Sequence, residues 1–249
     1  MKPALLLLIT LAACATKPES HTPIGDSMIA GPFVATLVES MEFRIPVVPA
    51  RPENDRYKLA LLLHSLDGKT RRTVPIKSGL RAGDFMHTAR MFEDDGQRLF
   101  FHANEPLAYN YSSGNLSIAN PPHPRSFSTP KPKDFRGKAE SICNDCKRPA
   151  LLLAKPNGAP QNLANPDSQL LLHRSNRPIF GTELVSRATP DGKLLWTADT
   201  NLQDVDQIIP TATHTVFIGR EAPARPDAFR PAVLVIIDNQ TGSISTHPL

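Results

Sequence analysis

Twenty-five prolines are spread along the 249 residues of this chain, and they set the first limit on its fold. Proline lacks a backbone N–H and its ring clashes with the preceding helical turn, so it ends or kinks helices. Aromatic residues make up only 6% of the chain. We therefore expect short strands joined by frequent chain reversals, and no long helices.

Apolar runs of strand length alternate with turn sequences along most of the chain. Tyr57–Leu66 and Thr70–Ile76 flank the turn Asp67-Gly68 and predict a β-hairpin. Further strand–turn–strand patterns surround Glu93–Gly96, Ser112–Asn115, Pro190–Gly192 and Gln240–Gly242. The predicted fold class is all-β, built from antiparallel hairpins.

A short apolar stretch in the first residues is typical of an export signal. Met1 and Lys2 precede a run from Ala4 to Leu11, which is shorter than the roughly 20 residues of a membrane-spanning helix. Leu11-Ala12-Ala13-Cys14 follows and resembles the lipobox of bacterial lipoprotein signal peptides. The resemblance implies a signal peptide at residues 1–13 and acylation of Cys14. Ordinary secretory cleavage after Ala13 is the alternative.

The lipoprotein resemblance also implies a location. A multiply acylated cysteine supplies the two anchoring signals that stable membrane attachment requires. Residue 15 is Ala, whereas Asp at this position retains Gram-negative lipoproteins in the inner membrane. We therefore expect a lipid anchor in the outer membrane, facing the periplasm. Residues 14–27 are small, polar and Pro-bearing, which predicts a tether.

Residues 28–249 are expected to form a single β-rich domain with one long loop. The segment at about 119–149 alternates prolines with Lys and Arg, as in Pro130-Lys131-Pro132-Lys133. Such a sequence cannot build a strand ladder or bury much apolar surface, so it predicts a basic Pro-rich loop.

Two segments resemble the blades of quinoprotein-like and WD40-like β-propellers. Leu184–Trp196 contains a strand, the turn Asp191-Gly192-Lys193 and a following Trp, and Val233–Gly242 ends in the turn Thr241-Gly242. The second segment departs from the motif, because Ser243 and Thr246 replace its Lys and Trp. The resemblance implies a small or incomplete propeller in which Trp196 fills the space between sheets. A β-sandwich is the alternative.

The propeller resemblance brings no cofactor with it. Most non-enzymatic members of this fold bind no quinone, so no cofactor is predicted. The whole chain is also similar to proteobacterial lipoproteins of unknown activity that carry partial propeller sequence, and that similarity implies no reaction either.

Cys143 and Cys146 form the one chemically distinctive pair after the signal peptide. The spacing Cys-Asn-Asp-Cys suits a local disulfide, a redox couple or half of a zinc site. Zinc lacks two further ligands nearby, and Lys147 stands where haem attachment requires His. An oxidising compartment favours a structural disulfide.

Catalytic and metal-binding motifs are otherwise absent from the sequence. It contains no Gly-x-Ser-x-Gly elbow, His-Glu-x-x-His helix or Walker loop, so no catalytic residue is predicted. Among the scattered histidines, only His87 and His102 are expected to approach one another, across a hairpin. The acidic run Glu93–Asp95 lacks the ligand spacing of a calcium loop, which favours a solvated turn.

Charge and motifs together leave two classes of function. The net charge is +4 with both signs interspersed, which predicts no nucleic-acid partner. The first class is a lipid-anchored binding or scaffold protein without catalysis, partnered with an envelope protein. Its specific form is an immunity lipoprotein that blocks a periplasmic toxin. The second class is an envelope hydrolase whose site is dispersed in the sequence.

Overall fold

The computed structural model describes residues 21–43, 55–81, 89–122, 147–151, 168–175, 181–225 and 228–249. Within these ranges every regular element is a β-strand and every strand pair is antiparallel, which confirms the predicted all-β class. The described residues contain no helix with the length and apolar character needed to cross a membrane.

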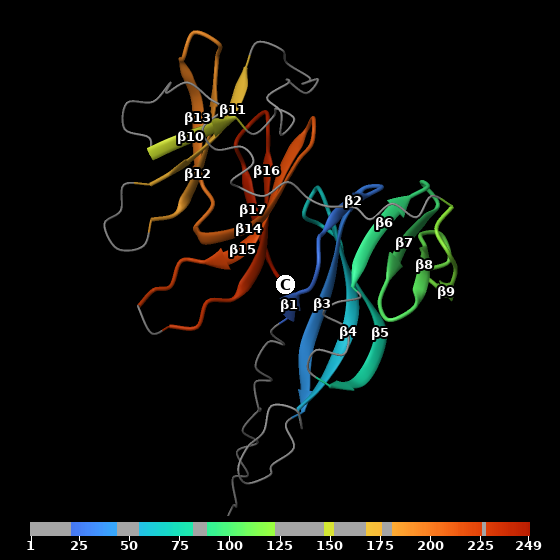
Figure 1. Ribbon diagram of the computed structural model, residues 1–249. Coiled ribbons are helices and arrows are strands. Elements are labelled where there is room, and N and C mark those ends of the chain that lie inside the picture. Colours follow the sequence, from blue (N-terminus) through green and yellow to red (C-terminus); the bar gives the residue numbers. More distant parts are fainter. Residues whose placement is uncertain are drawn as a thin grey trace, which may run out of the picture.

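Four sheets follow one another along the chain, and in all but the first each strand pairs with its neighbours in sequence (Figure 1). The first sheet contains β1 (His21–Pro23), β2 (Met28–Ala30), β3 (Phe33–Phe43), β4 (Arg56–Ser65) and β5 (Arg71–Arg81). The second contains β6 (Arg90–Asp94), β7 (Arg98–His102), β8 (Pro106–Asn110) and β9 (Leu116–Ile118). The third contains β10 (Lys147–Leu151), β11 (Gln169–Arg174), β12 (Glu183–Ala188) and β13 (Leu194–Asp199). The fourth contains β14 (Leu202–Pro210), β15 (His214–Glu221), β16 (Ala232–Asp238) and β17 (Ile244–Pro248).

The predicted hairpin turns are present and rest on local side-chain bonds. In the β4–β5 turn the carboxylate of Asp67 accepts hydrogen bonds from the Ser65 hydroxyl at 2.5 Å and the Lys69 amide at 3.1 Å. Gly68 follows with φ +72°, a left-handed conformation that glycine adopts without a steric clash because it has no Cβ. The strands on either side are then aligned so that His64 pairs with Arg71.

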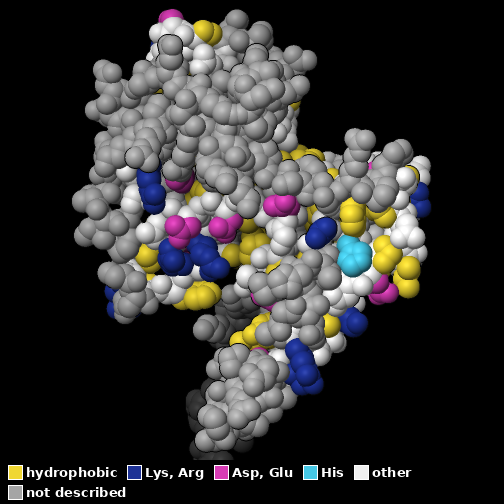
Figure 2. All heavy atoms as spheres, viewed as in Figure 1, with side chains coloured by type: hydrophobic (Ala, Val, Ile, Leu, Met, Phe, Trp, Pro, Cys, Tyr) yellow, Lys and Arg dark blue, Asp and Glu magenta, His cyan; other side chains and the backbone are white. Residues whose placement is uncertain are grey.

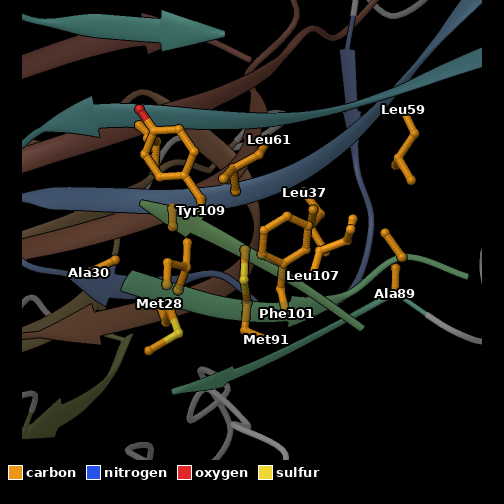
Figure 3. Packing of buried hydrophobic residues seen from close by; sticks show 14 of the residues in the cluster. Met28, Ala30, Leu37, Leu59, Leu61, Ala89, Met91, Phe101, Leu107 and Tyr109 are labelled. Carbon is orange, nitrogen blue, oxygen red and sulfur yellow. The ribbon is translucent and has the colours of Figure 1, made fainter. Parts of the chain in front are cut away.

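The sheets pack face to face in the order second, first, fourth, third. Leu37 and Leu61 of the first sheet contact the second through a core that includes Phe101 (Figure 3). On the opposite face of the first sheet, Leu62 belongs to a core shared with Leu234 of the fourth. Each of these middle sheets is therefore buried on both faces, which explains the continuous apolar runs Leu59–Leu63 in β4 and Ala232–Ile237 in β16.

The stack corresponds to a propeller-like arrangement that is open on one side. The other face of the fourth sheet packs on the third, where Phe217 and Val235 meet Leu172 and Val185. Among the described residues, the three hydrophobic clusters join second to first, first to fourth and fourth to third, and none joins second to third. Four successive sheets packed in this way differ from a two-sheet sandwich.

Residues 21–23 form β1 and residues 24–27 connect it to β2, so the predicted tether is wrong for residues 21–27. His21 pairs with Ser40 in β1–β3, and the Ile24 amide donates to the Leu37 carbonyl at 2.9 Å. Ile24 is buried in the core, and so is Ser27. The segment was interpreted as polar because its few apolar side chains are separated by turn residues, but Ile24 packs in the core.

One further boundary and one whole strand differ from the sequence interpretation. β10 begins at Lys147, which lies within the range assigned to the Pro-rich loop, and residues 123–146 of that loop fall outside the described residues. β14 was not predicted at all, because Gln203, Asp204 and Asp206 interrupt its apolar residues.

Candidate functional site

The cysteines predicted to act chemically lie outside the described residues. Cys14 is the predicted acylation site, and Cys143 and Cys146 are the predicted disulfide. Both remain predictions. His87 also lies outside the described residues, so the proposed pair with His102 has no described geometry, while the His102 ring stands edge-on to Phe92 at 6.5 Å.

The acidic residues between β6 and β7 form the hydrogen bonds of a turn. Asp95 accepts bonds from the amides of Gln97 and Arg98 at 2.9 and 2.6 Å, and these bonds lower the pKa of its carboxyl group despite an opposing effect of desolvation. Asp94 accepts bonds from the amides of Gly31 and Gly96. Across the part of the chain that the structure describes, no three His, Cys, Asp or Glu side chains are placed to hold a metal ion.

A histidine pair that the sequence did not predict lies between the first and fourth sheets. His64 belongs to β4 and His247 to β17, and their ring centroids are 5.5 Å apart. The His64 side chain is buried, with 1% of the residue exposed. Neither of its ring nitrogens has a hydrogen-bond partner, and the Nε2 of His247 has none either.

The surroundings of the pair favour neutral imidazoles. Burial, together with the nearby charges of Arg71 and His247, lowers the pKa of His64 to about 4. Burial also lowers the pKa of His247, again with a contribution from Arg71. At neutral pH the two rings can pack as uncharged groups, and they can accept protons only at a cost to the folded state.

The histidine pair occupies a close junction between the two sheets. A Cβ on Gly68 would lie 3.1 Å from the Ser245 hydroxyl and 3.2 Å from Nε2 of His247, so the β4–β5 turn packs directly on β17. At the same boundary, the His21 amide donates to the Leu249 carbonyl at 3.2 Å. The first and last described segments are therefore in contact.

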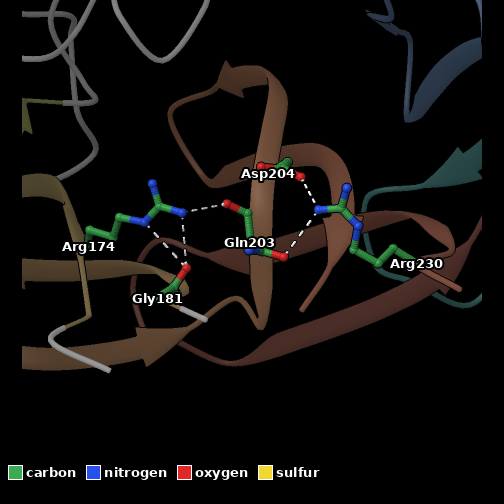
Figure 4. Close-up of polar contacts among 5 residues, drawn as sticks. All are labelled: Arg174, Gly181, Gln203, Asp204 and Arg230. Carbon is green, nitrogen blue, oxygen red and sulfur yellow. Dashed lines mark hydrogen bonds and ion pairs between the residues drawn. The ribbon is translucent and has the colours of Figure 1, made fainter. Parts of the chain in front are cut away.

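A polar cluster joins the third and fourth sheets (Figure 4). Arg174 donates from its guanidinium to the carbonyls of Gly181 and Gln203, the second at 3.1 Å. Arg230 donates to the side chains of Gln203 and Asp204. The Arg230–Asp204 ion pair is partly exposed, so it contributes less than about 1 kcal/mol. Figure 2 shows positive and negative side chains mixed on the visible face.

Trp196 also lies between the third and fourth sheets, although it is only half-buried. Its indole N–H donates to the Gln240 carbonyl at 3.2 Å, and its ring packs so close to Gly242 that a Cβ there would be 2.6 Å from Cδ2. The location between sheets agrees with the sequence interpretation. The ring is covered only in part, because β13 is an edge strand and its neighbours Leu194 and Leu195 are exposed.

Comparisons with known proteins identify no family. No family model matches the chain, and no curated protein matches it. Among solved structures, the β-propeller domain of the Trilobed protease from Pyrococcus furiosus, with an open velcro topology, is similar at TM-score 0.25 and 11% identity over 92% of this chain. The GH43 endo-arabinanase from Bacillus licheniformis is similar at TM-score 0.25 and 9% identity over 88% of this chain.

These similarities do not define the fold, which rests on the strand order and packing of the chain itself. The chain spans 57% of the length of the protease propeller domain and 75% of the arabinanase. The four sheets described above make this an all-β protein of the propeller-like class. Its described polar clusters form hydrogen bonds that join neighbouring sheets.

Proposed function

We propose that this protein is a lipid-anchored binding or scaffold protein on the periplasmic face of the outer membrane, and that it acts without catalysis. The sequence Leu11-Ala12-Ala13-Cys14 carries this proposal. The start of β1 at His21, seven residues after Cys14, is compatible with it because a short segment then separates the acylated cysteine from the fold.

A binding role is supported by the way in which the described polar groups are used. Gln207 of β14 accepts a hydrogen bond from the Ser27 amide at 2.7 Å and donates one to the Gly25 carbonyl at 2.8 Å. Buried Arg187 donates to Ser168 and to the Asn239 carbonyl. Side chains that form hydrogen bonds between sheets make the scaffold rigid. The loops of a rigid scaffold commonly recognise binding partners.

Metabolic labelling tests the anchor. Cells that express the full chain receive an alkyne fatty acid, and the purified protein is examined by fluorescence and mass spectrometry. We expect label on the wild type and none on Cys14→Ser, while Cys143→Ser, the matched control, labels normally. Label that persists in Cys14→Ser, or its absence from the wild type, would contradict the proposal.

In-cell crosslinking tests the binding role. We expect the wild type to give a reproducible crosslink to one envelope protein, and we expect the purified chain to turn over no substrate in a panel of esters, peptides and glycosides. A hydrolytic activity that co-purifies with the chain would overturn the non-catalytic proposal and favour a hydrolase.

A further inference from the structure

We propose that one end of the first sheet lies against the anionic phospholipid headgroups of the membrane that carries the anchor. The inference rests on the proposed acylation of Cys14 and extends it from the anchor to the folded chain. We call this surface the tether end. It consists of Met41 and Glu42 on β3, Arg56 and Lys58 on β4, and Lys77 and Arg81 on β5.

The strand register brings these residues to the point where the chain enters the fold. His21 pairs with Ser40, and β1 runs antiparallel to β3, so the chain arrives at the end of β3 that carries Met41. Ser40 is opposite Lys58, and Arg56 is opposite Arg81. In Figure 1 the ends of β3 and β5 lie together at the bottom of this sheet, where Figure 2 shows Lys and Arg side chains.

The short segment between Cys14 and His21 restricts how far the tether end can move from the bilayer. Seven residues span at most about 25 Å when fully extended. Neighbouring strands are about 4.8 Å apart, so Arg81, three strands from β1, lies on the order of 15 Å across the sheet. The whole tether end is therefore held near the headgroups of any membrane that holds Cys14.

The side chains at the tether end suit an anionic lipid surface. Lys77 and Arg81 are exposed on an edge strand, and Met41, two strands away on β3, is 45% exposed. Long basic side chains can reach headgroup phosphates while an apolar neighbour enters the boundary of the bilayer. Each such charge near an anionic membrane contributes roughly fivefold in binding, which corresponds to about 1 kcal/mol.

Three carboxylates lie close to these charges and oppose the attraction in part: Glu39, Glu42 and the buried Asp55, which precedes Arg56. Glu42 accepts a hydrogen bond from the Gly79 amide at 2.9 Å, which holds its carboxylate against the β5 backbone. Burial raises the pKa of Glu39. Lys77 and Arg81 remain exposed on the outermost strand, where a flat membrane can reach them.

Hydrogen exchange on the acylated full chain in vesicles tests this inference. The chain is reconstituted in vesicles of phosphatidylcholine with 30% phosphatidylglycerol and, separately, in phosphatidylcholine alone. The test variant is Lys77→Gln/Arg81→Gln. The matched control is Lys69→Gln/Arg72→Gln, which removes the same charge at the opposite end of β5 and its turn.

We expect amides of residues 39–42, 56–58 and 77–81 to exchange several-fold more slowly in the anionic vesicles than in the neutral ones. High salt and the test variant should abolish this difference, while the control variant should keep it. Met41→Ser, a second variant without charge change, should reduce it.

Equal exchange in both vesicles on a chain shown by mass to be acylated would overturn the membrane contact and leave the anchor intact. Protection at residues 66–72 instead would show that the opposite end faces the membrane. Protection only after envelope extract is added would assign the surface to a protein. Absence of the acyl group would remove the basis of both proposals.

Discussion

The ring of His64 lies 5.5 Å from the ring of His247, at the junction between the first sheet and the last. Both rings have unpartnered nitrogens in the folded state, and Arg71 adds a positive charge nearby. A proton on either ring would have to be accommodated beside that charge without a hydrogen-bond acceptor. The junction therefore links the stability of the fold to pH.

The first prediction is that the protein loses stability on acidification through His64. Its pKa is about 4 when folded and 6.5 in the unfolded chain, so the unfolded state binds the proton more readily. The loss begins below about pH 6.5 and is complete below about pH 4, where it reaches about 3 kcal/mol. Above pH 6.5 this effect is absent. Urea unfolding between pH 7.5 and 4 measures it.

His64→Leu isolates this contribution. Leucine removes the titrating group and its unpaired nitrogens, so the variant should retain stability at neutral pH and lose much less of it on acidification. His214→Gln, at the start of β15 where the ring contacts the Thr213 hydroxyl, serves as the matched control and should keep the wild-type dependence of stability on pH. Identical profiles for wild type and His64→Leu would refute the assignment.

Local signals in the sequence were strong wherever a turn needs a particular residue. Asp67-Gly68 and Thr241-Gly242 both form turns in which the glycine has a positive φ, and the flanking strands pair as expected. Such turns depend on a few adjacent residues, so a single sequence is enough to recognise them.

Contacts between sheets had no comparable signal in the sequence by which they could be predicted. Gln207 and Ser27 are 180 residues apart, and no spacing rule connects them. β14 likewise becomes a strand because Ile208 packs toward the third sheet and Ile209 toward the first, a tertiary effect that outweighs its polar sequence. The histidine pair was missed for the same reason.

The second prediction concerns the contact between Gly242 and Trp196. Gly242→Ala combines a left-handed backbone, φ +75°, with a Cβ only 2.6 Å from the indole, so we expect a loss of about 2–4 kcal/mol. Gly96→Ala has a similar φ and open space around it, and should lose only about 1 kcal/mol. Urea unfolding of the two variants, monitored by the fluorescence of the single Trp, compares their losses of stability. Equal losses of stability in the two variants would show that the indole of Trp196 moves aside without a cost in free energy.

The third prediction concerns Cys143 and Cys146, which we expect to be oxidised in the exported protein. A ring this small removes little entropy from the unfolded chain, and the chain-entropy model gives about 1.5–2.5 kcal/mol, which strain can cancel. Cys143→Ser/Cys146→Ser should therefore keep the fold and most of the thermal stability. Thiol counting checks the oxidation, and two free thiols or one bound zinc would contradict it.

The fourth prediction concerns Gln207, which connects the last sheet to the residues wrongly expected to be a tether. Gln207→Ala leaves the buried Ser27 amide and the Gly25 carbonyl without these partners, at a cost of about 2–4 kcal/mol. Gln97→Ala, in the exposed β6–β7 turn, should change stability by less than about 0.5 kcal/mol. Exchange of the amides at 24–28 should rise in Gln207→Ala before the β15–β16 core opens. Unchanged exchange there would mean that the apolar contacts of Ile24 and Met28 alone hold this segment in place.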